Sequence, residues 1–206
     1  VKTTAQGTAA LALGSPRDAI LQMPSKAANG PVPLMVLLHG AGGGGERILR
    51  RLGPAGDAAV IAMLAPDSRG SSWDAIRGDF DEDVAFLNRA LEKVFQTVAV
   101  DPARLSVGGF SDGATYGASL GLINGDLFTR VVAFSPGFVI PGTPYGKPRF
   151  FVSHGTNDPI LPINRCGRVI VQMLRGRGYD VTFREFDGQH EIPEPIAAEG
   201  MAWAAK

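Results

Sequence analysis

Short apolar runs alternate with longer helical patterns along this chain, and this alternation constrains the fold more than any other feature of the sequence. The 206 residues include 27 glycines and 15 prolines, which separate one run from the next. Strands that alternate with helices typically form a mostly parallel sheet, because each helix carries the chain back to the start of the next strand. The sequence therefore predicts an α/β fold with helices on both faces of a central sheet.

Strands are expected where a short apolar run is bounded by Gly, Pro or Asp. Such runs cover residues 34–38, 60–64, 105–107, 131–134, 150–153 and 181–186. Two weaker runs, 8–13 and 19–23, suit an opening antiparallel hairpin. Helices are expected over residues 79–96, 112–123, 163–175 and 195–205. In the first of these helices, apolar residues recur at steps of three and four, as on one face of an amphipathic helix.

No linker rich in Pro, Gly or Ser divides the chain, so a single domain over residues 1–206 is expected. A chain of this length can bury roughly 70% of the surface that its unfolded form exposes, which suffices for one substantial core. The connections are short and leave little or no room for a lid. The longest irregular piece, residues 135–147, could form a small flap.

Composition excludes several classes of protein. Hydrophobic residues make up 45% and charged residues 19%, as in soluble globular proteins. The formal net charge is zero and no basic stripe is present, so no nucleic-acid partner is expected. The longest apolar runs, such as residues 32–38, are far too short to span a bilayer. The oligomeric state is not indicated.

The single cysteine and the first residue bear on the compartment. Cys166 is alone, so an intrachain disulfide is impossible, and a free thiol favours the reducing cytoplasm. The chain begins at Val1, with no pattern of a signal peptide, which leaves a trimmed or secreted mature form open.

A nucleophilic serine is indicated by the segment Gly109-Phe110-Ser111-Asp112-Gly113, which matches the pattern G-x-S-x-G. This pattern places the serine on a tight turn between a strand and a helix, where flanking side chains would collide with their neighbours. The alternative is a serine that caps a helix in a glycine-rich turn. An apolar strand before the segment and a helix-compatible sequence after it favour the nucleophile.

The loop at residues 39–45, His-Gly-Ala-Gly-Gly-Gly-Gly, follows the strongest strand and offers backbone N–H groups for an oxyanion hole. We expect the donors to be Ala41 and Asp112, with Gly42 as the alternative to Ala41. A Walker phosphate loop fails because Gly45 is followed by Glu46 rather than by lysine. A dinucleotide loop fits the glycine spacing, with Asp67 as the one acid near the required place, and stays a weaker alternative.

His190 is the candidate general base. In α/β proteins whose nucleophile lies in a G-x-S-x-G turn, the triad residues follow one another along the chain in the order nucleophile, acid, histidine. His190 alone among the three histidines lies C-terminal to every plausible acid, whereas His39 and His154 suit structural roles. Asp158, just past an expected strand, is the preferred acid that would orient the histidine. Asp187 lies three residues from His190 and is expected to cap its own loop.

The chain resembles the phospholipase/carboxylesterase branch of the α/β-hydrolases, which includes acyl-protein thioesterases, and bacterial esterases related to polyhydroxyalkanoate depolymerases. The resemblance runs from about residue 34 to 193 in family order. Its motifs are Leu37–Gly40, Ala65–Gly70 with Trp73-Asp74, Gly109–Gly113, His154–Pro162 and Gly188–Pro193. Two departures, Asp112 in place of the glutamine of thioesterases and Gly113-Ala114 in place of two glycines, leave the triad intact but carry over no particular substrate.

The resemblance implies an α/β-hydrolase fold and a carboxylesterase that forms an acyl-enzyme on Ser111, without a metal or organic cofactor. Small or short-to-medium acyl esters are the expected substrates, because little room is left for a lid. Thioesterase or peptidase chemistry on the same triad, and a non-catalytic ligand-binding module, are the alternatives. Trp73, Tyr116 and Phe138 either line a substrate pocket or simply pack beneath loops.

Overall fold

The structure is a computed structural model that describes residues 7–26 and 30–206. Val1, and with it the start of the chain discussed above, lies outside the described residues. The described residues form an eight-stranded sheet in the order β1-β2-β4-β3-β5-β6-β7-β8. The strands are β1 Thr8–Ala10, β2 Ala19–Gln22, β3 Val32–Leu38, β4 Ala62–Pro66, β5 Val100–Phe110, β6 Arg130–Phe134, β7 Arg149–Gly155 and β8 Val181–Phe186.

The sheet is parallel from β4 to β8, and the β1–β2 hairpin extends it as antiparallel strands. This arrangement confirms the predicted mostly parallel sheet and the opening hairpin. β3 is buried along its whole length, as a strand covered on both faces must be.

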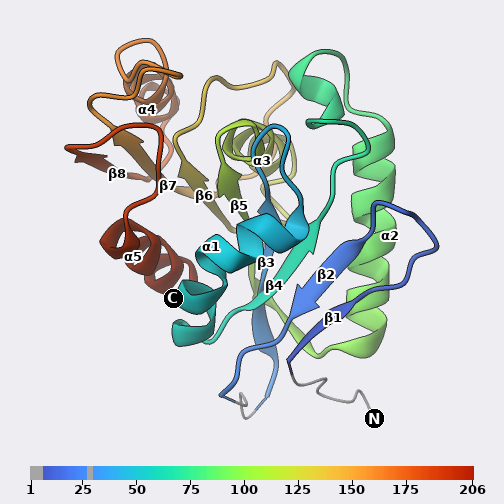
Figure 1. The fold of residues 1–206 in the computed structure, drawn as a ribbon. Coiled ribbons are helices and arrows are strands. Elements are labelled where there is room, and N and C mark those ends of the chain that lie inside the picture. The colour runs from blue at the N-terminus through green and yellow to red at the C-terminus, as the bar shows by residue number, and fades with distance from the viewer. Residues whose placement is uncertain (1–6, 27–29) are drawn as a thin grey trace.

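Helices cover both faces of the sheet (Figure 1). The helices are α1 Gly45–Ala58, the short 3₁₀ turn η1 Asp74–Ile76, α2 Glu82–Thr97, α3 Asp112–Ile123, α4 Gly167–Gly176 and α5 Glu194–Ala204. The apolar faces of α1 and α5 pack in one core cluster, and those of α2, α3 and α4 in another. The alternating side chains of β3 divide between these two cores, because successive strand residues point to opposite faces.

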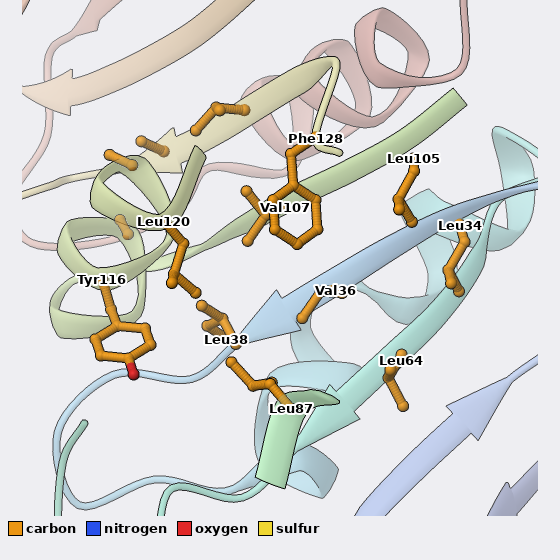
Figure 2. Packing of buried hydrophobic residues seen from close by; sticks show 14 of the residues in the cluster. Leu34, Val36, Leu38, Leu64, Leu87, Leu105, Val107, Tyr116, Leu120 and Phe128 are labelled. Atoms are coloured by element: carbon orange, nitrogen blue, oxygen red, sulfur yellow. The ribbon is translucent and has the colours of Figure 1, made fainter. Parts of the chain in front are cut away.

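Figure 2 shows the core beneath α2 and α3. Residues from three neighbouring strands meet there, and side chains from the two helices close over them. The labelled residues are Leu34, Val36, Leu38, Leu64, Leu87, Leu105, Val107, Tyr116, Leu120 and Phe128. Full burial of one such leucine stabilises the fold by roughly 1.5–3 kcal/mol, so this cluster holds the ends of β3 and β5 rigidly beside each other.

The strand order reverses between β3 and β5. The chain passes from β3 outward to β4 and then returns across β3 to β5, after which the strands follow one another to the other edge. Where such a reversal occurs, the loops at the carboxyl ends of the two strands diverge to opposite faces and leave a crevice. The glycine-rich loop after β3 and Ser111 after β5 flank this crevice.

The sequence prediction missed α1 altogether. Its glycines at positions 45, 53 and 56 and Pro54 inside the helix are poor helix formers. The helix nevertheless buries Ile48, Leu49 and Leu52 against the sheet, and this tertiary packing outweighs the weak propensity. Two strand boundaries also differ: β4 begins two residues later than predicted, and β5 extends well beyond the three predicted residues.

The irregular segment 135–148 is bonded to α3. Its Gly137 and Ile140 N–H groups donate to the hydroxyls of Thr115 and Ser119 on α3, at 2.8 and 2.9 Å. Phe138 of this segment lines a cavity together with residues of α4, and this cavity does not include Ser111. Cys166, immediately before α4, is 8% exposed and packs in the interior.

Candidate active site

Ser111 has a backbone conformation that side-chain-bearing residues rarely adopt. It lies between the end of β5 and the start of α3 with φ 57° and ψ −121°. Such a conformation costs of order 1–3 kcal/mol and persists only where the surroundings enforce it. A Cβ atom added to Gly109 would lie 2.5 Å from the Leu38 carbonyl oxygen, and one added to Gly113 would lie 2.2 Å from it. The two glycines therefore allow the turn to pack against β3, as the sequence motif predicts.

The structure brings Ser111, His190 and Asp158 together, although they come from three separate loops. His190 Nε2 lies 2.9 Å from Ser111 Oγ, and His190 Nδ1 lies 2.7 Å from Asp158 Oδ2. The His190 ring also packs against Phe110, with ring centroids 4.7 Å apart. A serine, a histidine and a carboxylate in this order of contacts have the geometry of an activated nucleophile.

The buried Asp158 carboxyl is held as an anion. Burial works to raise its pKa, but the Leu161 N–H, the His190 ring and the Ile160 N–H outweigh burial, and the pKa of Asp158 is lowered. A carboxylate can only accept hydrogen bonds, so the proton between Asp158 and His190 lies on Nδ1. Nε2 then carries a lone pair directed at the Ser111 hydroxyl, as a general base requires.

Backbone contacts between the loops after β7 and β8 bring His190 to Asp158. The Thr156 N–H donates to the Phe186 carbonyl at 2.9 Å, and the Asn157 N–H donates to the Gly188 carbonyl at 3.0 Å. A Cβ atom at Gly155 would lie 2.2 Å from the Gln189 carbonyl oxygen, so the two loops cross at a point where only glycine fits. Asp187, the rejected alternative acid, accepts a hydrogen bond from Asn157 Nδ2 at 2.7 Å.

His154 lies next to the same Asp158 oxygen that His190 contacts. Its side chain is fully buried, and Nε2 lies 2.6 Å from the Leu161 carbonyl oxygen and 3.3 Å from Asp158 Oδ2. Burial lowers the pKa of His154, so the ring is neutral at pH 7, and its Nε2–H donates to the Leu161 carbonyl oxygen. These contacts agree with the structural role predicted for this histidine.

Ala41 and Asp112 have N–H groups that are free to bind an oxyanion. Neither N–H has an acceptor within the part of the chain that the structure describes. The Gly42 N–H, by contrast, donates to the Ser71 carbonyl at 2.6 Å, so the alternative donor is already engaged. The oxyanion role itself stays a prediction, but this hydrogen bonding favours Ala41 over Gly42.

The segment Ser71-Ser72 contacts both the loop that carries Ala41 and the residue Asp112. Ser71 accepts the Gly42 N–H, and the adjacent Ser72 hydroxyl donates to Asp112 Oδ2 at 2.5 Å. The Ser71–Ser72 segment thus links the loop after β3 to the start of α3. Sequence reasoning did not identify these serines, because no motif marks a residue that acts through contacts between loops.

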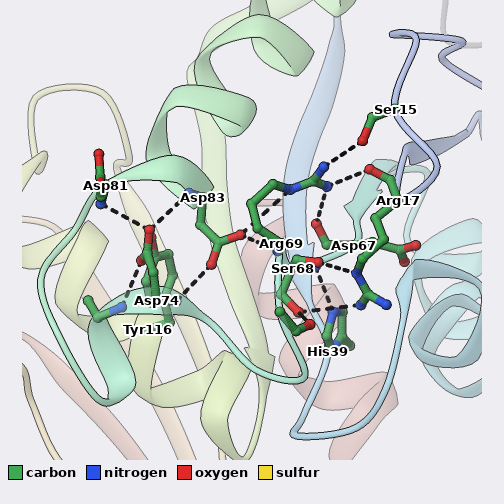
Figure 3. A network of polar contacts seen from close by, with 12 residues as sticks. Ser15, Arg17, His39, Asp67, Ser68, Arg69, Asp74, Asp81, Asp83 and Tyr116 are labelled. Atoms are coloured by element: carbon green, nitrogen blue, oxygen red, sulfur yellow. Dashed lines mark hydrogen bonds and ion pairs between the residues drawn. The ribbon is translucent and has the colours of Figure 1, made fainter.

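His39 organises the glycine-rich loop from beneath (Figure 3). Its Nδ1 lies 2.7 Å from the Gly40 carbonyl oxygen, and its Nε2 accepts the Ser68 N–H at 3.0 Å. These partners place the proton on Nδ1. Trp73 Nε1–H donates to the His39 carbonyl at 2.8 Å. Burial lowers the pKa of His39, so the ring stays neutral within this network. The structural role predicted for His39 agrees with these contacts.

Two acidic residues, the buried Asp83 and the partly exposed Asp74, continue the same network (Figure 3). Asp83 accepts the Arg69 N–H at 2.6 Å and the Asp74 N–H at 2.7 Å. Asp74 in turn accepts the Tyr116 hydroxyl at 2.9 Å. These bonds anchor the segment after β4 to α2 and α3. Trp73 and Tyr116 are therefore packed beneath the loops and do not line the cavity next to Ser111, which decides between their two predicted roles.

The dinucleotide alternative is disfavoured by Asp67. In a dinucleotide site, the pyrophosphate lies at the N-terminus of the helix that follows the glycine-rich loop. Here Asp67 Oδ1 accepts the Gly45 N–H at 2.7 Å, so a carboxylate already occupies the start of α1. Among residues 7–26 and 30–206, no group of three His, Cys, Asp or Glu side chains has a metal-binding arrangement.

A cavity of about 660 Å³ opens beside Ser111 and His190. Its apolar wall is formed by Ile48, Phe110, Ile160 and Ile192. Its charged rim is formed by Arg47, Arg50, Arg51 and Glu191. The three arginines were not among the predicted site residues, because they belong to α1, which the sequence pattern did not indicate.

The chain has relatives among named esterases. It is 32% identical over 146 residues to "Probable feruloyl esterase C" of Aspergillus niger, a match that covers 66% of this chain and 53% of that protein. It is 29% identical over 109 residues to acyl-protein thioesterase 1 of Gibberella zeae, covering 46% and 45%. The chain thus spans about half the length of the curated relatives it matches. No family model matches it.

Solved structures share its architecture. FphF, a fluorophosphonate-binding serine hydrolase of Staphylococcus aureus, aligns with a TM-score of 0.77 and 14% identity, over 98% of this chain and 100% of that one. The carboxylesterase of Bacillus cereus aligns with a TM-score of 0.72 and 23% identity, over 92% and 94%. Similarity at these identities shows a common fold. No helix within the described residues is long and apolar enough to cross a membrane.

Proposed function

This chain has the α/β-hydrolase fold, and from that premise we propose that it is a serine hydrolase that cleaves carboxylic esters. The observation that carries the proposal is the unbroken sequence of contacts from Ser111 Oγ through His190 to Asp158, at 2.9 and 2.7 Å. Relatives named as esterases and a thioesterase support the same chemistry.

In the first half of the reaction, Ser111 Oγ attacks the ester carbonyl carbon while His190 Nε2 accepts the hydroxyl proton. The carbonyl oxygen becomes an oxyanion, which the N–H groups of Ala41 and Asp112 stabilise; such a donor is typically worth about 3–4 kcal/mol. The bond to the alcohol oxygen then breaks, and His190 delivers its proton to that oxygen. The products of this half are an acyl-Ser111 ester and a free alcohol.

In the second half, a water molecule attacks the acyl carbon of Ser111 as His190 Nε2 removes its proton. The oxyanion forms and collapses again, the Ser111 Oγ–acyl bond breaks, and the proton returns to Ser111. Throughout, the anionic Asp158 stabilises the imidazolium and keeps the ring oriented. The reaction thus consumes one ester and one water and yields one acid and one alcohol.

The substrate is proposed to be a small or short-to-medium acyl ester that reaches Ser111 through the adjacent cavity. A thioester would follow the same steps with sulfur in the leaving group. The non-catalytic alternative is not favoured, because a binding module would have no need of a histidine bonded to both serine and carboxylate. The single domain, the lack of a nucleic-acid partner and a cytoplasmic location stay predictions.

The proposal is tested by hydrolysis of 4-nitrophenyl esters of graded acyl length, comparing the unaltered protein with Ser111→Ala and with Ser25→Ala, a surface control. We expect turnover by the unaltered protein and the control, and loss of nearly all activity in Ser111→Ala. A fluorophosphonate probe should label the first two proteins and not the third. An unaltered protein that is inert on every ester and takes up no probe would overturn the proposal.

A further inference from the structure

Positive charge gathers on one side of the cavity next to Ser111. Arg47, Arg50 and Arg51 come from the first two turns of α1, and all three line this cavity. Glu191 is the one acidic residue among those that line it. Figure 1 shows that α1 lies in front of β3 and beside α5.

The three arginines differ in how far their charges are already compensated. Arg50 forms an ion pair with Glu46 at 2.5 Å on the outer surface of the helix. Arg51 Nη2 donates to the Ile192 carbonyl at 2.6 Å, which fixes the side chain but leaves its charge in place. The Arg47 guanidinium has no hydrogen bond or ion pair with any residue in 7–26 or 30–206. Glu191 Oε1 accepts the Gln189 N–H at 3.1 Å.

The cavity therefore combines an apolar wall with a free cation. Ile48 follows Arg47 on α1, and Phe110 and Ile192 lie on the same wall next to the nucleophile. A hydrocarbon or aromatic group would bury itself against this wall. An acidic group attached to it could reach Arg47, whose planar guanidinium suits a carboxylate and forms two parallel hydrogen bonds with it.

We propose that the substrate is an ester that carries a second, ionised acidic group, and that Arg47, assisted by Arg51, binds this group. The inference rests on the proposed ester hydrolysis at Ser111. The acidic group belongs either to the acyl part, as in the half-ester of a dicarboxylic acid, or to the alcohol part. In both cases the recognised chemistry is a carboxylate separated from the reacting carbonyl by an apolar segment.

Two sets of paired substrates distinguish these sources. In the acyl set, half-esters of adipic and suberic acid are compared with neutral acyl esters of equal chain length and the same fluorogenic alcohol. In the alcohol set, the acetate ester of 4-hydroxybenzoate is compared with that of 4-hydroxybenzamide. We expect kcat/KM to favour the anionic member of one set by about five- to tenfold, and this ratio to fall as salt screens the charges.

The charge reversal Arg47→Glu tests the assignment of the residue. It should lower the anionic-to-neutral ratio by at least about tenfold, because attraction is replaced by repulsion. The matched control is Arg165→Glu. It alters an exposed arginine that lines the cavity of Phe138 and α4, and it should leave the anionic-to-neutral ratio unchanged.

The failures of the two proposals are distinguishable. If the anionic and neutral esters are hydrolysed at equal rates, the inference is overturned and ester hydrolysis stands. The same holds if the preference for anionic esters persists in Arg47→Glu. Inertness toward all esters, together with an unlabelled Ser111, would overturn both. Loss of the preference in Arg165→Glu to the same extent would show a general charge effect and would also overturn the role of Arg47.

Discussion

At the scale of single residues, the position of one proton determines what His190 can do. The anionic Asp158 holds that proton on Nδ1, and Nε2 is therefore left to accept the proton of Ser111. If the proton were on Nε2 instead, this nitrogen would have no lone pair for the Ser111 hydroxyl. His190 could then not act as a general base, however close Nε2 lies to Ser111 Oγ.

The variant Asp158→Asn tests this point. The Asn amide can donate to Nδ1, which favours the wrong tautomer of His190, so kcat should fall by about ten-thousand-fold with little change in KM. Ester hydrolysis at pH 7 measures the loss, and circular dichroism checks that the fold is retained. A decrease of less than about tenfold would mean that Asp158 is not the acid of a triad.

A second residue-scale prediction concerns Ser72, a positioning residue. Its hydroxyl donates to Asp112 Oδ2 at 2.5 Å, and so holds the first residue of α3, whose N–H is assigned to the oxyanion. Ser72→Ala should lower kcat by about tenfold and leave KM unchanged, because the donor is needed mainly in the transition state. Ser25→Ala removes a similar hydroxyl–carboxylate contact, to Asp57, far from the site and should change neither constant. A rise in KM alone in Ser72→Ala would contradict the positioning role.

The triad could be predicted from the sequence because each member carries a local mark. Ser111 lies in a motif, and Asp158 and His190 follow expected strands in the required order. Ser72 and Arg47 could not be found in this way. Their importance comes from contacts between segments far apart in the chain, or from a helix whose pattern was obscured by glycine and proline.

At the scale of elements, the close approach of α3 to β3 fixes the height of the nucleophile. Gly113→Ala would place a Cβ atom 2.2 Å from the Leu38 carbonyl oxygen, so the helix or the strand must move. We expect the free energy of unfolding to fall by about 1–3 kcal/mol, together with a loss of esterase activity. Urea unfolding and ester hydrolysis measure the two effects.

Gly176→Ala is the matched control for this prediction. Gly176 ends α4, and a Cβ atom added there would meet no heavy atom within 4 Å. Alanine is the better helix former, so this variant should be as stable as the unaltered protein or slightly more stable. Equal destabilisation of both variants would show that loss of the glycine backbone, rather than the crowding at Leu38, is responsible.

α1 illustrates which elements a sequence reading misses. Strands such as β3 are apolar throughout and are recognised at once, whereas α1 combines three glycines and one proline with one apolar stripe. Its stability comes from the sheet beneath it: a Cβ atom at Gly45 would lie 2.2 Å from the Ala65 carbonyl oxygen, and one at Gly56 would lie 2.2 Å from Met63 Sδ. The glycines that weaken the helix in isolation are thus the ones that allow it to pack.

At the scale of the whole molecule, two buried histidines make stability depend on pH. Burial lowers the pKa of both His39 and His154 below the ordinary value of 6.5. Between the lowered pKa and 6.5, the unfolded chain binds protons that the folded chain does not. The free energy of unfolding therefore falls as the pH drops below 6.5, by up to roughly 1.4 kcal/mol per pH unit for each histidine.

Urea unfolding at pH 7.5, 6.5 and 5.5 tests this expectation. Asp83 acts in the opposite direction: burial raises its pKa, so at pH values above 3.8 the folded chain holds a proton that the unfolded chain releases. Asp158, whose pKa is lowered, contributes stability that is lost only as the pH falls below 3.8. Stability that stayed constant or rose between pH 7.5 and 5.5 would contradict the account.

The overall architecture was predictable because the alternation of strands and helices admits few arrangements. Right-handed crossovers and a parallel sheet follow from that alternation, and they bring the ends of β3, β5 and β7 to one edge. The strand order and the crevice between β3 and β5 were not predictable from local patterns. They depend on which faces of the sheet α1 and α2 cover, and thus on packing between distant parts of the chain.

The burial of Cys166 has a practical consequence for observing this site in solution. The chain has one thiol, which is 8% exposed, and burial raises its pKa, so reagents that attack thiolates reach it slowly. Ile160, by contrast, is 66% exposed at the mouth of the cavity beside Ser111. A fluorophore attached through Ile160→Cys would therefore label one position, and its emission would follow ligand entry and product departure in real time.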